Sequence, residues 1–397
     1  MADTLKPRDG ADVEAAVGWA LAEAKTLEIV GHGSKRGIGR AAQWDLSLDL
    51  SDLSAVTLYE PEELVLSAKA GTPLAEIEAL LAANNQELAF EPMDYGPLFG
   101  APAGQGTIGG TLAANLSGPR RIKAGAARDH FLGFTAVSGR AETFKSGGRV
   151  VKNVTGYDLC KVMAGSWGTL GAMTDVTVKV LPRAETEQTL LVLGLDDAKA
   201  AQAMSAAMNS SNDVSGAAHL PPPVALRVTG ADRAVTALRV EGVAPSVAHR
   251  MTSLETLLMS FGALATLDET TSRPFWTSVR DVMPFAGDDR VVWRISAAPS
   301  RGHAIAAAIG EGEYFYDWAG GLIWLAVAPV HDGGAARVRS AVAGHGHATL
   351  IRAPAGLRAS VAVFEPQTQG LAALTRRVKE SFDPKGLLGP GRMIAGV

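Results

Sequence analysis

The sequence has almost no cysteine, no strong charge bias and no long hydrophobic run, and each absence excludes a class of protein. Cys160 is the only cysteine among 397 residues, which excludes intrachain disulfides and the paired cysteines of zinc and iron–sulfur sites. A formal net charge of −4 gives no reason to expect nucleic acid or an anionic membrane surface as a partner. The longest apolar run, Leu322 to Val330, is far shorter than the roughly 20 residues of a spanning helix.

Location and size follow from the same features. The first ten residues lack the apolar core of an export signal, and one cysteine gives no sign of an oxidising compartment. We therefore expect a cytoplasmic protein without a transmembrane segment. A chain that is 47% hydrophobic and 20% charged is ordinary for a globular protein, and its length predicts two domains.

Hydrophobic periodicity predicts elements of two kinds in the first half of the chain. Val13 and Val17 share one face of a helix expected at 11–24. Thr72 is expected to cap a second helix that Pro73 opens. The strands expected in this half lie at 27–30, 64–70, 131–137 and 174–180.

The second half alternates strands and helices without phosphate-type glycine loops. This rhythm predicts a cap domain, with an antiparallel sheet and helices on one of its faces. Residues 184–188 are polar and are expected to link the two halves. Leu371, Leu374, Val378 and Phe382 predict a late helical stripe that breaks at Asp383. The expected strands lie at 190–193, 225–228, 291–295 and 322–328, and the helices at 196–208, 245–261 and 303–309.

Glycine-rich segments are the most informative feature of the chain. They lie at 31–39, 104–110 and 165–171. Glycine at this density lets backbone N–H groups approach a phosphate without interference from Cβ atoms. Distant segments of this kind predict a ligand longer than one phosphate group. A Rossmann nucleotide site is an alternative, but it needs a helix starting inside the first loop, and the residues after Arg40 alternate like a strand.

In their order along the chain, these motifs resemble the FAD-binding domain of the vanillyl-alcohol oxidase and p-cresol methylhydroxylase (PCMH-type) family. The resemblance rests on the first glycine loop, Ala-Gly-Thr-Pro-Leu, Thr-Ile-Gly-Gly, Lys-Asn-Val-Thr-Gly-Tyr-Asp and Gly-Ser-Trp-Gly-Thr-Leu-Gly. The end of the chain, from Phe382 to Met393, is similar to that family's closing signature. Within the family, the resemblance is greatest to FAD-binding subunits of bacterial glycolate oxidases, through Ser117-Gly118-Pro119-Arg120-Arg121, the stretch 149–154 and the stretch 346–354.

The resemblance implies an α+β fold in three parts. These are a two-part PCMH-type FAD-binding domain at 1–183, an α+β cap domain with an antiparallel sheet at 184–379, and a C-terminal tail at 380–397 that returns to the FAD domain. The flavin would lie between the FAD domain and the cap.

The resemblance also implies which residues hold FAD. The first loop and Lys35 would hold the pyrophosphate, the second segment would follow the diphosphate and the flavin edge, and the third would pass the ribityl and adenosine part. The implied cofactor-binding residues are Gly31, Gly33, Ser34, Lys35, Gly37, Thr107, Gly109, Gly110, Arg128, Asp129, Gly165, Ser166, Gly168, Thr169, Gly171 and Val176.

Two departures from the family pattern affect these expectations. Some relatives bond the flavin covalently through a histidine just before the loop serine, but this chain has Gly33 there and His32 one residue earlier. We therefore predict non-covalent FAD. The family's Asn-Pro-Gly ending is Gly389-Pro390-Gly391 here, which removes one side-chain amide.

Oxidation of a 2-hydroxy acid needs a base for the hydroxyl proton and a cation for the carboxylate. The candidates are His347 as base, with His345 as the alternative, and Arg352 as the carboxylate clamp. Strand spacing would place His347 and Arg352 on opposite faces, which weakens the pairing. His345 and His347 could ligate a metal, but no third ligand is near in sequence, so no metal site is predicted.

Two functional hypotheses from different classes follow. In the first, the chain is an FAD-carrying subunit of a glycolate dehydrogenase complex, with a second flavoprotein subunit and an iron–sulfur subunit as partners and a small 2-hydroxy acid as substrate. Such a complex could hold the chain at the periphery of the inner membrane. In the second, the chain is an assembly scaffold whose sister flavoprotein subunit performs catalysis. A stand-alone FAD oxidase of another 2-hydroxy acid is a third, weaker alternative.

Overall fold

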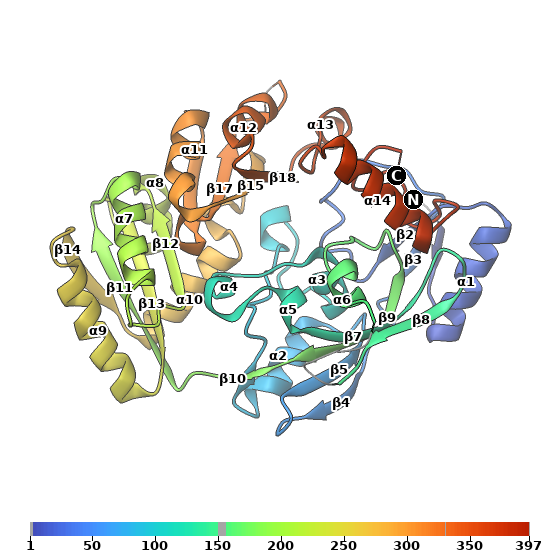
Figure 1. Cartoon of the computed structure of the whole chain (residues 1–397), viewed down its shortest axis with the longest axis horizontal. Coiled ribbons are helices and arrows are strands. Elements are labelled where there is room, and N and C mark those ends of the chain that lie inside the picture. The colour runs from blue at the N-terminus through green and yellow to red at the C-terminus, as the bar shows by residue number, and fades with distance from the viewer. Residues whose placement is uncertain (1–2, 150–155, 330, 397) are drawn as a thin grey trace.

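The computed structural model describes residues 3–149, 156–329 and 331–396, and these form two lobes (Figure 1). The first lobe contains a three-stranded and a five-stranded sheet, and the cap lobe contains an eight-stranded sheet. The stretch 150–155, which carries part of two motifs quoted above, lies outside the described residues. None of the helices in the described ranges is long and apolar enough to cross a bilayer.

The three-stranded sheet is parallel, with β3 between β1 and β2. Val13 and Val17 of α1 pack against Leu27 and Leu48 of this sheet, as their spacing predicts. Leu388, near the end of the chain, forms a parallel bridge with Leu27. The bounds are β1 (Asp3–Leu5), α1 (Gly10–Ala22), β2 (Leu27–Val30) and β3 (Leu46–Asp49).

The five-stranded sheet is antiparallel, in the order β4-β5-β9-β7-β8. Ile77 of α2, Ile108 of α3 and Met163 of α6 pack against its strands in one hydrophobic cluster. The bounds are β4 (Val56–Glu60), β5 (Val65–Lys69), α2 (Leu74–Ala82), β6 (Gln86–Glu87), η1 (Pro97–Phe99), α3 (Ile108–Ala114), α4 (Arg121–Ala124), α5 (Ala127–His130), β7 (Phe131–Val137), β8 (Thr143–Gly147), α6 (Leu159–Met163), β9 (Ala172–Lys179) and β10 (Leu181–Pro182).

The cap sheet is antiparallel throughout, in the order β14-β11-β13-β12-β16-β17-β15-β18. Helices α7 and α9 cover half of one face and α11 and α12 cover the other half. The bounds are β11 (Thr186–Leu193), α7 (Asp197–Met208), β12 (Gly216–Leu220), α8 (Pro222–Thr229), β13 (Val235–Gly242), α9 (Ala244–Leu258), β14 (Ala263–Leu267), α10 (Glu269–Arg280), η2 (Met283–Phe285), β15 (Val291–Ala297), η3 (Pro299–Arg301), α11 (Gly302–Ile309), β16 (Glu313–Asp317), η4 (Trp318–Gly320), β17 (Leu322–Val327), α12 (Ala335–Val342), β18 (Gly346–Arg352), α13 (Ala355–Ser360) and α14 (Gln369–Phe382).

Four local predictions are wrong. The stretch 225–228 is helical, because Pro222 and Pro223 start α8 there. The predicted linker at 184–188 runs into β11, which begins at Thr186. Thr72 does not cap α2, because its hydroxyl instead donates to the Lys69 carbonyl at 2.7 Å. Helices also cover both faces of the cap sheet, since α8 and α10 pack on the face opposite α7 and α9.

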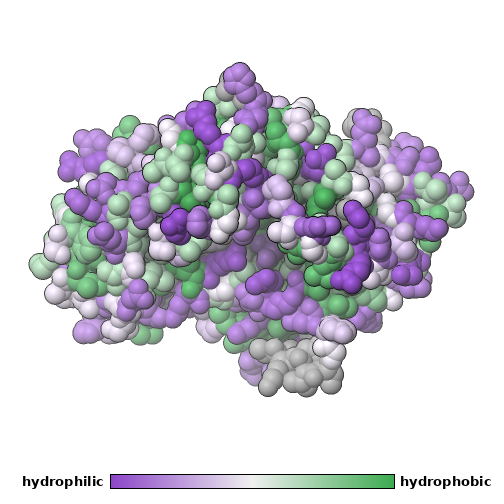
Figure 2. Space-filling view, turned by 45° about the horizontal axis from the view of Figure 1, so that its top comes forward, coloured by the Kyte–Doolittle hydropathy of each residue, from purple (hydrophilic) through white to green (hydrophobic). Residues whose placement is uncertain are grey.

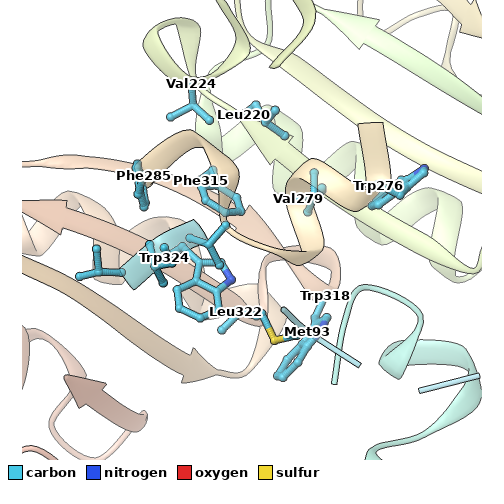
Figure 3. Packing of buried hydrophobic residues seen from close by; sticks show 14 of the residues in the cluster. Met93, Leu220, Val224, Trp276, Val279, Phe285, Phe315, Trp318, Leu322 and Trp324 are labelled. Carbon is cyan, nitrogen blue, oxygen red and sulfur yellow. The ribbon is translucent and has the colours of Figure 1, made fainter. Parts of the chain in front are cut away.

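A shared hydrophobic cluster joins the two lobes. Tyr95 and Leu116 of the first lobe pack with Trp324 and Phe285 of the cap, and Figure 3 shows Met93 of the first lobe among the cap residues of this cluster. Hydrophilic side chains line the hollow between the lobes in Figure 2.

Part of the seam between the lobes is a buried network of charges. Arg120 of the first lobe pairs with Glu87 and with Glu241 of the cap, at 2.7 and 2.6 Å. Arg239 of the cap in turn pairs with Glu91 of the first lobe at 2.8 Å. The seam therefore combines apolar packing with ion pairs that fix the register of the lobes.

The C-terminal segment returns to the first lobe through α14. Lys379 is buried there and donates to Asp383 at 2.6 Å and to the carbonyls of Thr169 and Leu388 at 2.7 Å. The predicted stripe is only partly buried, since Leu371 and Leu374 are about half exposed. The end of α14 is therefore attached both by the polar contacts of Lys379 and by Val378 and Phe382, which pack against the core of the first lobe.

Candidate functional site

All three glycine segments contribute residues to the lining of one cleft in the first lobe. Ser34 and Thr107, which are 73 positions apart, both line it. The predicted cofactor residues that line the cleft are Gly31, Gly33, Ser34, Lys35, Thr107, Gly109, Gly110, Gly168 and Gly171. The structure therefore brings together the residues that were predicted to contact a long anionic ligand.

Thr107 and Gly31 show why glycine is needed in this cleft. Thr107 begins α3, and its Oγ1 accepts a hydrogen bond from the Gly110 N–H at 3.2 Å. A Cβ atom on Gly31 would lie 2.7 Å from that Oγ1. Gly33 adopts φ +76° and Gly168 adopts φ +77°, a region that side chains disfavour. The loops thus approach one another with their backbones exposed to the cleft.

Lys35 places a cation inside the cleft. Burial lowers the pKa of its ammonium group to about 8. Ser34 Oγ accepts a hydrogen bond from Lys35 Nζ at 3.3 Å, and Asp94 is the charged group that opposes the effect of burial. A buried ammonium beside glycine backbone suits a diphosphate, because the negative charge of the diphosphate would neutralise the positive charge of Lys35.

Arg392 also lines the cleft, and the sequence analysis did not single it out. It is buried, and its guanidinium carbon lies 6.0 Å from the ring centre of Trp44 and 5.9 Å from that of Trp167. Its Nη2 donates to the Lys35 carbonyl at 3.3 Å, while its buried Nε has no partner among the described residues. Arg392 belongs to the closing signature at Phe382–Met393, and its positive charge in that signature was the signal that could have predicted its place in the cleft.

Other predicted cofactor residues lie outside the cleft lining. Val176 is a core residue of β9, and Gly37 packs against Phe99. Asp129 pairs with Lys161 at 3.0 Å and caps its own short helix through the Ala126 N–H. The remaining residues outside the lining are Arg128, Gly165, Ser166 and Thr169.

Arg352 is corrected from carboxylate clamp to structural residue. Its guanidinium donates to the carbonyls of Arg290, Leu98 and Phe285 and to the Asp288 carboxylate, at 2.6 to 2.9 Å. Four of its five N–H donors are therefore engaged. The prediction that His347 and Arg352 lie on opposite faces of the strand assumed that side chains alternate strictly between the two faces. A bulge in the pairing of β15 with β18 interrupts that alternation before Arg352.

His347 is exposed on β18 and lies opposite Ser296 of β15. Partial burial of its ring and the nearby Arg294, Arg121 and Arg339 hold the pKa of His347 below its usual value, against the opposing charge of Glu365. The lowered pKa favours the neutral imidazole, which is the form that can accept a proton. His345 is exposed as well, and the described residues contain no group of three or more His, Cys, Asp or Glu side chains suited to a metal ion.

Comparison with known proteins identifies the family. The sequence profile described as "FAD binding domain" matches residues 2–147. The chain is 32% identical over 383 residues to glycolate oxidase subunit GlcE of Escherichia coli (strain K12), which covers 96% of this chain and 95% of that one. The chain belongs to the GlcE family of FAD-linked oxidoreductase subunits. FAD is its cofactor, and the predicted resemblance is confirmed.

A shorter sequence match and solved structures show further similarity. Glycolate oxidase subunit GlcD of Bacillus subtilis (strain 168) is 41% identical over 99 residues, which are 21% of that protein. The structure of p-cresol methylhydroxylase with substrate bound matches 99% of this chain and 88% of that one, with a TM-score of 0.72 and 13% identity. Alkyldihydroxyacetonephosphate synthase matches with a TM-score of 0.67 and 17% identity. These structures show the fold, and the α+β PCMH-type prediction is confirmed.

Proposed function

We propose that this chain is the FAD-carrying subunit of a glycolate dehydrogenase complex, and that it oxidises a small 2-hydroxy acid at its own flavin. The observation that carries the proposal is the match to GlcE along nearly the whole chain, on a structure whose glycine segments converge in one cleft. The partial match to GlcD supports a second flavoprotein subunit as partner.

The residues of the cleft suit non-covalent FAD. Gly31, Gly33 and Gly110 offer backbone close to the ligand, and Lys35 and Arg392 supply positive charge. Bound FAD supplies a two-electron acceptor for a hydride. His347, whose lowered pKa favours the neutral imidazole, accepts the hydroxyl proton as the carbon–oxygen double bond of the 2-oxo acid forms.

Electrons have to leave the chain through a partner. Cys160 is the only cysteine, and it is buried on α6 with the pKa of its thiol raised to about 12 by burial. One buried thiol cannot hold an iron–sulfur cluster, which takes several cysteine ligands. The proposal therefore includes an iron–sulfur subunit, and a cytoplasmic complex that reaches the periphery of the inner membrane through its partners.

Flavin counting tests the proposal directly. The chain is expressed alone and with the subunits encoded beside it, and FAD is measured per chain before and after anaerobic addition of glycolate. We expect about one FAD per copy of this chain, with bleaching of its absorbance by glycolate in the complex. A colourless chain whose removal leaves glycolate oxidation intact in a sister subunit would replace the proposal with the scaffold hypothesis.

A further inference from the structure

The cap sheet presents two buried donors without acceptors toward the first lobe. Arg294 of β15 and Trp324 of β17 lie directly opposite each other, so their side chains share one face of the sheet. Trp324 packs in the cluster that joins the lobes (Figure 3). Its ring centre lies 6.1 Å from that of Tyr95. Neither Arg294 Nε nor Trp324 Nε1 has a hydrogen-bond partner among the described residues, although both atoms are buried.

Arg121 brings a second guanidinium to the same place from the first lobe. Its guanidinium carbon lies 4.4 Å from the Trp318 ring centre, and that of Arg294 lies 4.9 Å from the same centre. Arg120, the neighbour of Arg121, is paired with three carboxylates at the seam. Arg121 and Arg294, in contrast, form no ion pair within the described ranges of the chain.

The carboxyl group of Asp317, whose charge opposes the lowered pKa of Arg294, is a weak counter-charge. Asp317 is fully buried, and burial raises its pKa to about 7. One of its oxygens already accepts the Trp318 N–H at 2.7 Å. Burial also lowers the pKa of the Arg294 guanidinium, with Tyr95 and Asp317 as the opposing groups. The cluster therefore has more donors and positive charge than its own acceptors can satisfy.

The cluster lies beside the candidate base, and Trp324 shares a hydrophobic core with a residue of the cofactor cleft. Thr349 lies opposite Arg294 and His347 lies two residues before it on the same strand face, so Arg294 and His347 are diagonal neighbours across the sheet. Ala114, which lines the cleft, belongs to the same hydrophobic cluster as Trp324.

We propose that Arg294, Trp324 and Arg121 form the carboxylate-binding site of the substrate, with His347 beside it. The inference rests on the proposed function and names the residues that select an anionic 2-hydroxy acid over a neutral diol. A carboxylate supplies two acceptor oxygens and one negative charge, which are the groups that the cluster lacks. Arg352, whose guanidinium makes four hydrogen bonds elsewhere, takes no part.

Ligand titration of the FAD-loaded chain tests this site. Glycolate, D-lactate and the neutral analogue ethylene glycol are added to wild type, Arg294→Gln, Arg121→Gln and Trp324→Phe, and binding is followed by calorimetry. We expect Arg294→Gln to weaken carboxylate binding about tenfold or more and Trp324→Phe to weaken it several-fold, as for lost charged and neutral hydrogen bonds. Arg301→Gln, which removes an exposed charge outside the cluster, is the matched control and is expected to bind within twofold of wild type.

The outcomes separate this inference from the proposed function. Carboxylate binding that stays within twofold in both Arg294→Gln and Arg121→Gln, with FAD retained, overturns the site, as does a wild type that binds neither acid. If carboxylate binding depends on Arg294 but glycolate does not reduce the flavin of this chain in the complex, the result supports the site and rejects glycolate oxidation. Should Arg294→Gln fail to fold, Arg121→Gln, on a short half-exposed helix, gives the same comparison.

Discussion

The cofactor cleft and the facing strands of the cap recognise anions by different means. The cleft is formed by glycine backbone from loops, and Lys35, Arg36 and Arg392 are among its lining residues. The cap cluster is formed by side chains on regular elements, above all Arg294 and Trp324 on neighbouring strands. Backbone can follow a long diphosphate along its length, whereas fixed side-chain donors can select a small carboxylate. We therefore expect substitutions around the cleft to change FAD binding, and substitutions in the cap cluster to change carboxylate binding.

The largest effect is expected where the tail is anchored beside the cleft. Asp383→Asn leaves the Lys379 ammonium buried with only carbonyl acceptors, and Gly139 lies so close to Asp383 that the site has no room to rearrange. Loss of one partner of a buried pair costs about 3 kcal/mol, which corresponds to a fall in melting temperature on the order of 5–10 °C. Differential scanning calorimetry measures this fall.

Release of the tail should also weaken the cleft, because Arg392 lies nine residues after Asp383. FAD retention during gel filtration of Asp383→Asn tests that link. Lys385→Gln, an exposed neighbour, serves as the control. A variant that melts early yet keeps FAD as tightly as wild type would show that the tail stabilises the lobe without contributing to the cleft.

The next effect concerns Lys35 and depends on pH. Lys35→Met should weaken FAD binding by about 1.5–3 kcal/mol, as for a lost charged hydrogen bond, or roughly tenfold to hundredfold in Kd. Because the lowered pKa of Lys35 is about 8, the free ammonium is charged at pH 7 and mostly neutral at pH 9.5. Wild-type affinity should therefore fall as pH rises through this range, while Lys35→Met should show no such fall. Flavin fluorescence titration at both pH values measures it, and Lys35→Arg should stay tight throughout.

The contrast between the two regions also explains what the sequence could and could not predict. Loops such as 31–39 carry their geometry in contiguous glycine patterns, so the cleft was predictable from local chemistry. The strands at 27–30 and 131–137 were equally local, and both lie where their composition predicts. Structure can be predicted from the sequence where one short segment contains all the residues that determine its conformation.

Sequence reasoning failed where the cause lies between distant segments. Arg352 looked like a free cation, but the carbonyl of Leu98, 254 positions away, engages it. Val176 was predicted to contact the adenine, and the structure places it in the hydrophobic core of the first lobe and outside the cleft lining, so this contact stays a prediction. The pairing of Arg294 with Trp324 depends on sheet register, which no local pattern specifies.

A smaller effect is expected from Arg392. Arg392→Gln keeps much of the side-chain volume between Trp44 and Trp167 but removes the charge and the orphaned Nε donor. Loss of one such interaction costs about 1–2 kcal/mol, so the Kd for FAD should rise roughly fivefold to thirtyfold. Equilibrium dialysis against FAD measures it. An unchanged Kd, with the same melting temperature, would assign Arg392 to packing of the tail alone.

The smallest effect connects the two regions through His347. Arg294→Gln removes the positive charge that contributes most, after burial, to the lowered pKa of His347, while Arg121, Arg339 and Glu365 remain in place. The pKa of His347 should therefore rise toward its ordinary value, as should the lower pH limit of activity, because the base has to be neutral to accept a proton. NMR of histidine-labelled chain, with His347→Gln to assign the signal, follows the titration directly.

A carboxylate bound at the same place should also raise the pKa of His347 in wild type, since an anion opposes the charge of the arginines. At the same glycolate concentration, the increase in the pKa of His347 should be smaller in Arg294→Gln than in wild type, because the variant binds less carboxylate. Equal increments in both proteins would place the bound carboxylate away from Arg294 and break the contrast between the two anion-recognising regions.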